Sequence, residues 1–278
     1  MTKALSYSLL DLVPYINWSY FFYAWGFPFS STPQDPAVES IYLDAKKIIS
    51  DYSDTYKVHA CFGLFEGCSD GDDIVVSLSF GDKVRIPFLR QQYFVGDGKP
   101  HLCWADFLAQ EGVNGDHRFG AFATCVSKDM EMLYCDDEYL HLLVRTLCDR
   151  LAEAAAEKLH EDVRKIYWGY ASWESLTPKE LFAEKYVGRR PAIGYPSLPD
   201  QSLTFLLDRL INLSAIGMRL TSSGMMIPHA AVCGFMFSHP AAKHFSIGKI
   251  DEEQFLDYAM RRGLPISEMK KYLATNIL

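Results

Sequence analysis

The chain has 278 residues, of which 49% are hydrophobic and 22% are charged, a composition typical of a globular protein with a sizeable core. Its 18 glycines, 13 prolines and 7 cysteines exclude collagen-like, disordered and disulfide-scaffold proteins. The formal net charge of −8 argues against a nucleic-acid partner, which needs a basic surface, and against electrostatic attachment to an anionic membrane.

The first half of the chain predicts one helix and several strands. The opening run from Tyr15 to Trp25 is rich in aromatic residues, and we expect the rest of the fold to cover it. Apolar spacing predicts a helix over residues 36–53. Four segments are typical of strands: 58–65, 74–79, 83–88 and 119–126. Residues 80–82 predict a hairpin connection between the second and third of them.

The second half opens with the clearest element, a long helix predicted over residues 137–168 from apolar residues at i, i+3, i+4 and i+7. Thr177 and Glu180 form a capping box that starts a short helix. A further helix is predicted from Asp200 to about Ala215, ending at Gly217. The remaining elements are strands over 225–237 and 245–250, then helices over 252–262 and 267–274, the first of them capped by Asp251.

Strands and helices are mixed without regular βαβ alternation, which favours the α+β class over a doubly wound parallel sheet. No repeat, low-complexity tract or Gly/Ser/Pro-rich linker divides the sequence. We therefore expect a single compact domain over residues 1–278, with a central twisted antiparallel sheet flanked by helices.

The cysteines predict a reducing compartment. Their number is odd and no CxxC pair occurs, so neither a disulfide framework nor a zinc site is indicated. The N-terminus lacks the features of a signal peptide, and no apolar run is long enough to span a membrane. We expect a cytoplasmic protein with neither a membrane nor a nucleic acid as partner.

The common catalytic motifs do not occur. The sequence has no P-loop, no GxGxxG after a strand, no HExxH and no GxSxG. The eight histidines lack metal-ligand spacing, and for His141 and His160 a satisfied or exposed structural role is the better explanation. These residues predict neither a catalytic group nor a metal site.

The segment RRPAIGYPSLPDQ, which starts at Arg189, is the most informative part of the sequence. Three prolines and one glycine fix an irregular, extended backbone whose polar groups are free to face a ligand. Arg190 could clamp a carboxylate, and Tyr195 could offer an aromatic face or a hydroxyl. The alternative is that Arg190 forms an internal ion pair and Tyr195 packs.

With MMIPHAAVCGFMFSHPAAKHFSIGKIDEEQFLDYAMRRG further on, this segment resembles the S-adenosylmethionine-binding activation (reactivation) domain of cobalamin-dependent methionine synthase. LVPYINWSYFFYAW, FLRQQ and VRKIYWGYA are similar to the same family, in the same order. The resemblance covers essentially the whole chain, which has no room for homocysteine, folate or cobalamin modules. We expect a freestanding activation subunit.

The resemblance implies a role in methionine biosynthesis, in which inactive cob(II)alamin on a partner is reactivated by reductive methylation. The methyl group comes from S-adenosylmethionine and the electron from flavodoxin or a similar donor. The implied partners are the cobalamin-binding methionine synthase modules, acting in trans. The corrinoid is the nucleophile, so this chain needs only to position the methyl donor, and no catalytic residue or metal is expected.

The family's ligand-binding positions carry over residue by residue. Arg190 is expected on the methionine carboxylate, and Ala192, Gly194 and Tyr195 lie on the segment that cradles the ligand. Four positions depart from the family pattern. Asn17 replaces an aspartate and removes a charge, Gln201 replaces a histidine, and His244 and Phe245 replace paired tyrosines. His244 can add a positive charge near a sulfonium.

The departures leave two alternatives to an activation subunit. The chain could be a non-catalytic module that binds a partner while its ligand pocket has degenerated. It could also activate a corrinoid methyltransferase other than methionine synthase.

Overall fold

The fold is described from a computed structural model that covers residues 1–78, 81–93, 96 and 98–278. Ser79 and Phe80, predicted at the end of a strand and in the following hairpin turn, lie outside the described residues.

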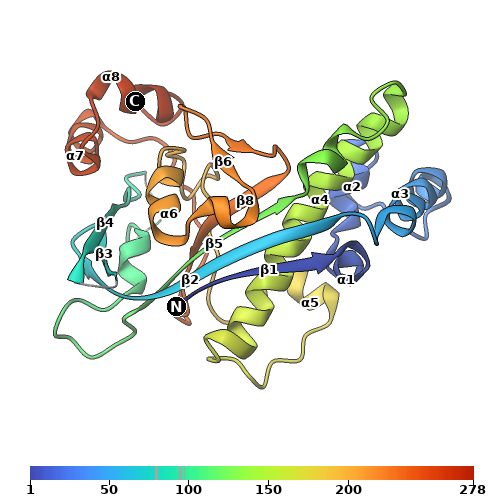
Figure 1. Cartoon of the computed structure of the whole chain (residues 1–278). Helices are drawn as coiled ribbons and strands as arrows, with labels where there is room; N and C mark the ends of the chain where they lie inside the picture. Colours follow the sequence, from blue (N-terminus) through green and yellow to red (C-terminus); the bar gives the residue numbers. More distant parts are fainter. Residues whose placement is uncertain (79–80, 94–95, 97) are drawn as a thin grey trace.

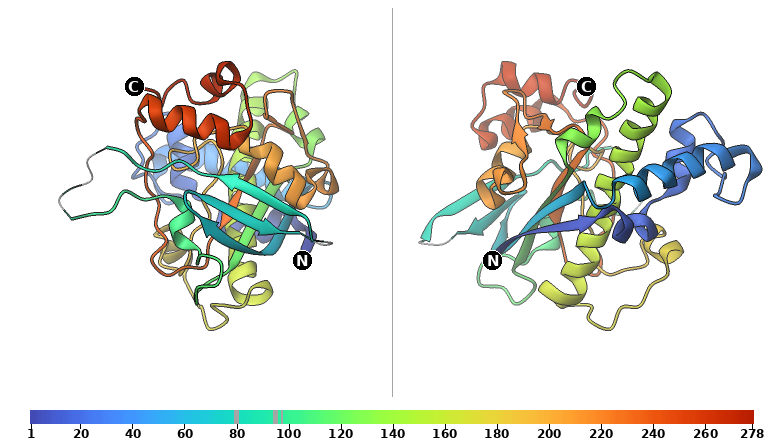
Figure 2. Two further views of the ribbon diagram at one scale, coloured as in Figure 1. Left: turned by 90° about the vertical axis from the view of Figure 1, so that its left-hand side faces the viewer. Right: turned by 45° about the vertical axis from the view of Figure 1, so that its right-hand side comes forward.

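A central antiparallel sheet organises the chain (Figure 1). Its strands follow the order β4-β3-β2-β5-β8, and β1 pairs with β2 off this path. The strands are β1 (Thr2–Ser8), β2 (Lys57–Asp70), β3 (Asp73–Ser77), β4 (Lys83–Pro87), β5 (Arg118–Val126) and β8 (Ala231–Met236). The sheet is twisted, with helices on both sides (Figure 2). The predicted α+β class and antiparallel sheet are confirmed, although β1 was not among the predicted strands.

The sheet separates two hydrophobic clusters because successive side chains of a strand point to opposite faces. On β2, Val58, Ala60 and Phe62 belong to the larger cluster, whereas Cys61 belongs to the one on the other side. This alternation buries both faces of the sheet and explains why β5 is almost entirely apolar.

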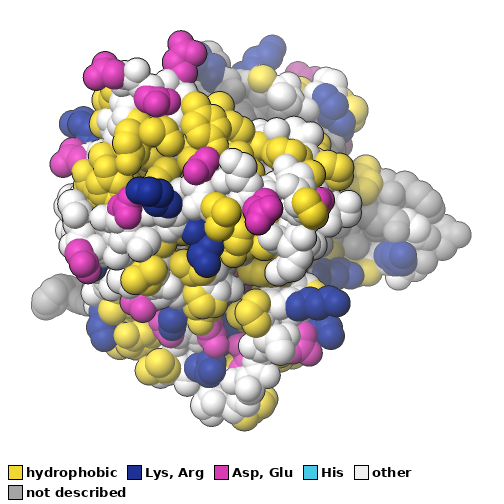
Figure 3. Space-filling model, turned by 90° about the vertical axis from the view of Figure 1, so that its right-hand side faces the viewer, with side chains coloured by type: hydrophobic (Ala, Val, Ile, Leu, Met, Phe, Trp, Pro, Cys, Tyr) yellow, Lys and Arg dark blue, Asp and Glu magenta, His cyan; other side chains and the backbone are white. Residues whose placement is uncertain are grey.

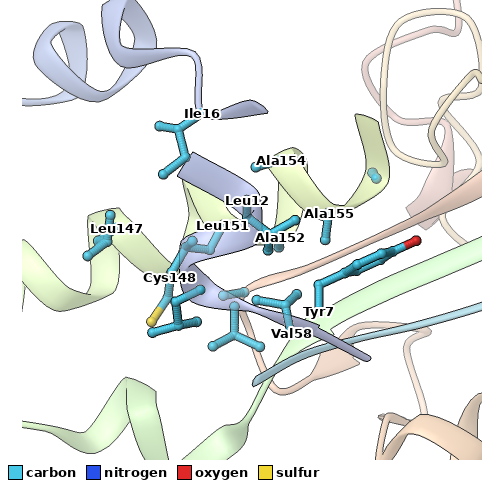
Figure 4. Packing of buried hydrophobic residues seen from close by; sticks show 14 of the residues in the cluster. Tyr7, Leu12, Ile16, Val58, Leu147, Cys148, Leu151, Ala152, Ala154 and Ala155 are labelled. Atoms are coloured by element: carbon cyan, nitrogen blue, oxygen red, sulfur yellow. The ribbon is translucent and has the colours of Figure 1, made fainter. Parts of the chain in front are cut away.

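The long helix α4 (Glu138–Asp162) covers the larger cluster, which confirms the helix predicted over 137–168. It is capped by Asp137, and its last turn is π-helical, from Val163 to Tyr167. Figure 4 shows Leu151 and Ala155 of α4 beside Val58 of the sheet. Three further helices pack on the same cluster: α1 (Leu9–Leu12), α2 (Trp18–Ala24) and α3 (Glu39–Tyr52).

The aromatic run in α2 is only half covered, so the expectation that the fold buries all of it is wrong. Phe21 and Phe22 are fully buried, but Tyr20 and Tyr23 are 50% and 62% exposed. Residues three apart share a helix face, so one face of α2 packs inward and the other faces solvent. The side of the molecule where α2 and α3 lie carries exposed hydrophobic side chains among charged ones (Figure 3).

The opposite face of the sheet is covered by α6 (Leu203–Ile211) and by the short 3-10 helix Leu213–Ile216. A continuous helix to residue 215 was therefore wrong: Asn212 takes a left-handed φ of 52° and breaks it. The predicted strand over 225–237 is also interrupted. It splits into β7 (Met226–Ile227), which pairs with β6 (Arg219–Leu220), and β8, with Pro228 between them.

The C-terminal segment forms a third cluster around α7 (Glu252–Arg262) and α8 (Ile266–Tyr272), two helices that the sequence predicted. Asp251 caps α7 as expected. Residues 245–250, by contrast, form no strand. Ile247 donates its backbone N–H to Pro196 and Ile250 to Asn276, so this segment is bound to loops and not to the sheet. The capping box that starts α5 (Pro178–Phe182) is confirmed.

Candidate functional site

A cavity of about 600 Å³ lies between α4, the segment around the start of α2, α5 with the loop after it, and two further loops. Its volume is in the range of small-molecule sites. Of the seven residues predicted to contact a ligand, six line it: Asn17, Arg190, Ala192, Tyr195, His244 and Phe245. The fold thus brings together residues from widely separated parts of the sequence.

Residues 189–197, here called the strap, form one wall of the cavity. The strap starts as an added strand along β8, because Arg189 and Phe237 exchange two backbone hydrogen bonds of 2.9 Å and Ile193 donates to Cys233 at 2.9 Å. The expectation that the backbone groups of this segment are free of pairing is therefore wrong for Arg189 and Ile193. Alternation leaves the groups of Arg190 and Ala192 directed away from β8.

Two glycines shape the strap. At Gly234 of β8, an added Cβ would lie 2.1 Å from the carbonyl oxygen of Pro191, so only glycine lets the strap lie this close. Gly194 has a φ of 89° and donates its N–H to Leu198 in a tight turn. Gly194 lies outside the cavity lining, and its turn carries Tyr195 to the cavity.

Arg190 is held by Glu157 of α4. Its Nη2 donates to Glu157 Oε2 at 2.8 Å, and the two side chains are 15% and 9% exposed. Burial lowers the pKa of Arg190, but Glu157, Tyr186 and Glu153 together outweigh burial and raise this pKa above its ordinary value, with Glu157 contributing most. The internal ion pair, which the sequence left as an alternative, is therefore present. A guanidinium has five N–H donors, and among the described residues only one of these is used.

A second carboxylate of α4 lies one helical turn earlier. Glu153 accepts a hydrogen bond of 2.6 Å from the hydroxyl of Tyr195, which is 51% exposed. Burial and the Glu153 carboxylate both raise the pKa of Tyr195, so this hydroxyl stays protonated and donates. Arg150, another turn back, lies 6.0 Å from the ring of Tyr20. Residues 150, 153 and 157 thus share the helix face that lines the cavity.

His244 and Phe245 form another part of the cavity wall. His244 Nε2 lies 3.3 Å from Glu184 Oε1, and the Phe245 ring lies 5.0 Å from that of Trp104. The hydrogen bond from His244 lowers the pKa of Glu184 against the opposing effect of burial. Glu184 has a φ of 51°, an uncommon backbone conformation, and its carboxylate lies beside His244.

The two remaining departures from the family pattern lie in different places. Asn17 lines the cavity as the N-cap residue of α2, and its side chain makes no capping hydrogen bond. Gln201 lies outside the lining, and its amide donates to the carbonyl oxygen of Gly224. Its substitution for a histidine therefore does not change the cavity lining.

The sequence did not indicate that acidic residues of α4 line a cavity. Glu157 stands among Ala154, Ala155, Ala156 and Leu159 on a buried helix face. A carboxylate in such a run requires a partner, and this was the signal that could have identified it. The other polar or aromatic lining residues that the sequence did not predict to contact a ligand are Tyr15, Tyr20, Arg150, Glu153, Phe182, Glu184, Tyr186, Ser197 and Ser246.

His160 lies behind the cavity and contradicts the expectation of a satisfied or exposed histidine. It is 1% exposed, and neither ring nitrogen has a hydrogen-bond partner among the described residues. Its ring packs edge-on against Tyr186, 5.0 Å away, which lines the cavity. Burial, followed by the charge of Arg164, lowers the pKa of His160, so its imidazole is neutral.

The described residues show no sign of a metal site or a membrane span. They contain no group of three or more His, Cys, Asp or Glu side chains placed to hold a metal ion. None of the described helices combines the length and the hydrophobicity needed to cross a bilayer. All seven cysteines are free, and five of them are buried.

Comparison with known proteins gives two findings. A sequence model of the family described as "Vitamin B12 dependent methionine synthase, activation domain" matches residues 8–263. A solved structure, described as the crystal structure of the MetH reactivation domain bound to AdoHcy, is 34% identical in sequence. The match covers 100% of this chain and 90% of that chain, with a TM-score of 0.93.

Proposed function

The chain belongs to the activation-domain family of vitamin B12-dependent methionine synthase, and on this premise we propose that its cavity binds S-adenosylmethionine. We further propose that all 278 residues act as one unit in the reductive methylation of cobalamin carried by a partner protein. S-adenosylmethionine supplies the methyl group in that reaction, and this chain binds and orients it.

The lining of the cavity fits such a ligand chemically. The amino-acid end of the ligand is a zwitterion. The cavity offers the guanidinium of Arg190 and the carboxylates of Glu153 and Glu157, which lie one turn apart on α4. Arg190 would take the ligand carboxylate with its unused N–H donors. Glu153 and Asn17 provide oxygen acceptors for an ammonium group. The unused donors of Arg190 beside carboxylates in one cavity are the observation that carries the proposal.

The adenosyl end requires flat apolar surfaces. Phe182, Phe245 and the exposed ring of Tyr195 provide them around the same cavity. The sulfonium is a cation, and three glutamates against two arginines give the lining one net negative charge when His244 is neutral. The charge balance therefore favours a cationic ligand.

Further parts of the proposal concern the partners. The client would be the cobalamin-binding modules of methionine synthase or of another corrinoid methyltransferase, and the electron donor a flavodoxin-like protein. The free cysteines fit a reducing compartment such as the cytoplasm.

The second candidate function is a partner-binding module whose ligand site has degenerated. Asn17 favours it, because an amide carries no charge to pair with a ligand ammonium. Partner binding that ignores S-adenosylmethionine would support this alternative, and ligand-dependent reactivation of cob(II)alamin would exclude it.

Titration calorimetry with S-adenosylmethionine tests the proposal. We expect saturable heat from the unmodified protein and affinity about 10- to 100-fold weaker for Arg190→Gln, because a hydrogen bond to a charged group contributes about 1.5–3 kcal/mol. Arg85→Gln is the matched control, since Arg85 is also paired with carboxylates, Asp70 and Asp73, but outside the lining. Absence of saturable heat from the unmodified protein, even with its corrinoid partner present, would contradict the proposal.

A further inference from the structure

Trp104 connects two parts of the cavity wall, although it does not line the cavity itself. Its side chain is fully buried, with an exposed fraction of 0%. The indole Nε1 donates a hydrogen bond of 3.2 Å to the carbonyl oxygen of Ser197, the last residue of the strap. Among the described residues, no other donor reaches this carbonyl oxygen. Because Ser197 lines the cavity, Trp104 directly fixes one lining residue.

The Trp104 ring also packs against His244 and Phe245, which line another part of the cavity. The centroid of the Phe245 ring lies 5.0 Å from that of Trp104, and the His244 centroid lies 6.1 Å away at an interplanar angle of 76°. Phe237, which follows β8, stacks on Trp104 at 4.9 Å and 21°. Aromatic pairs favour offset-stacked and edge-to-face geometries at such distances. One buried side chain thus contacts both the strap and the His244–Phe245 segment.

Trp104 is fixed by polar contacts that lie away from the cavity. It is the first residue of the 3-10 helix Trp104–Phe107, and Asp106 of this helix accepts a hydrogen bond of 2.8 Å from the backbone N–H of Cys103. Arg90 pairs with Asp106 at 2.7 Å and with Asp72 at 2.6 Å. None of these residues lines the cavity. The contacts that hold Trp104 are therefore formed whether or not a ligand is bound.

We infer that Trp104 is a positioning residue of the proposed ligand site. Through its hydrogen bond to Ser197 and its ring contact with Phe245, it holds the end of the strap and the His244–Phe245 segment in fixed relative positions. The inference rests on the proposed function, because both segments line the cavity in which S-adenosylmethionine would bind. Trp104 acts on affinity only through the lining residues that it holds, since small displacements of such residues weaken binding.

Calorimetry with S-adenosylmethionine tests the inference in Trp104→Phe. The substitution keeps an aromatic ring but removes the indole N–H, which leaves the carbonyl oxygen of Ser197 without a partner. We expect the dissociation constant to rise about 2- to 10-fold, the equivalent of one neutral hydrogen bond, while the number of ligands bound per chain stays the same. Each variant is titrated well below its melting temperature, where unfolded protein does not affect the dissociation constant.

Phe62→Leu is the matched control for a defect in the core. Phe62 is also 0% exposed, but it belongs to the larger hydrophobic cluster and lies outside the cavity lining. The substitution should lower the melting temperature, because buried aromatic volume is lost, and should leave the dissociation constant within about twofold of the unmodified protein. An equal rise in both variants would show that any core defect weakens binding, and it would overturn the inference.

Hydrogen exchange gives two tests that require no ligand. In Trp104→Phe, peptides that cover residues 193–198 and 244–247 should exchange about 2- to 10-fold faster, whereas Phe62→Leu should leave them unchanged. In the unmodified protein, the indole N–H of Trp104 should exchange at least about tenfold more slowly than that of Trp173, which is 77% exposed. Rapid exchange of the Trp104 indole would show that its hydrogen bond to Ser197 is not formed before the ligand binds, and would overturn the inference.

The outcomes separate this inference from the proposed function. If the unmodified protein binds S-adenosylmethionine and Trp104→Phe binds it equally well, the inference is overturned and the proposed function stands. Unchanged exchange of the strap peptides in Trp104→Phe would lead to the same conclusion. Failure of the unmodified protein to bind S-adenosylmethionine would instead overturn the proposed function.

Discussion

The Arg190–Glu157 pair should be strongly coupled energetically. Its atoms are 2.8 Å apart and its side chains only 15% and 9% exposed. Removing one partner of a fully buried pair costs about 3–5 kcal/mol, because the other charge is left uncompensated. Since Arg190 keeps some contact with solvent, we expect about 2 kcal/mol for Glu157→Gln. For a chain of this size, that corresponds to a melting temperature about 3–4 °C lower.

A double-mutant cycle measured by urea denaturation tests this expectation. Glu157→Gln and Arg190→Gln should each destabilise the protein, and the double variant should lose about 1–2 kcal/mol less than their sum, because it leaves no unpaired charge. The exposed pair Lys47–Asp51 is the control, with expected coupling below about 0.5 kcal/mol. Additive effects at Arg190 and Glu157 would refute the claim that α4 holds the strap through this pair.

Three further predictions concern the strap, a helix start and the acid range. Gly234→Ala should lower stability by about 2 kcal/mol or more in thermal melts, because its Cβ would meet the Pro191 carbonyl oxygen; an unchanged melt would show that the strap can move away. Thr177→Ala should cost about 1 kcal/mol in urea denaturation, since the hydrogen bonds of the Thr177 hydroxyl to the backbone and the side chain of Glu180 are lost, and Thr177→Ser should restore most of it. The hydrogen bond from His244 is the largest cause of the lowered pKa of Glu184. Ionised Glu184 therefore stabilises the folded protein above the ordinary glutamate pKa, and this contribution is lost as pH falls through the lower pKa of the folded state. Glu184→Gln should flatten the stability profile between about pH 5 and 3, and an unchanged profile would contradict this cause.

Much of the fold could be predicted from periodicity. The apolar stripe of α4 and the apolar runs of β2 and β5 follow directly from the burial of a helix face and of both sheet faces. The strand β1 was missed because it is mostly exposed and has few apolar residues. Residues 245–250 were wrongly predicted as a strand because Phe245 and Ile247 alternate as in a strand, although Ile247 and Ile250 are buried against α7 and α8 without pairing to the sheet. The spacing of apolar residues indicates which side chains are buried, but it does not indicate whether the backbone pairs with a strand.

The candidate site was only partly accessible to sequence reasoning. The strap was found because its prolines and glycine fix an unusual backbone, and Asn17 and His244 were found through family resemblance. Glu153 and Glu157 lie in a helix whose apolar stripe was assigned to the core, so their role facing a cavity was missed. No local pattern brings Glu157 to Arg190 or Glu184 to His244, because those contacts depend on how the loops fold onto α4.

The most direct test of the methyl-donor role is a transfer assay. A partner protein carrying oxidised cobalamin, a reductant and S-adenosylmethionine labelled in its methyl group would be mixed with this chain, with Arg190→Gln, or with neither. The account predicts that label reaches the cobalamin rapidly with the unmodified chain, at least tenfold more slowly with Arg190→Gln at subsaturating donor, and at background rate without the chain. Equal transfer in all three mixtures would contradict it.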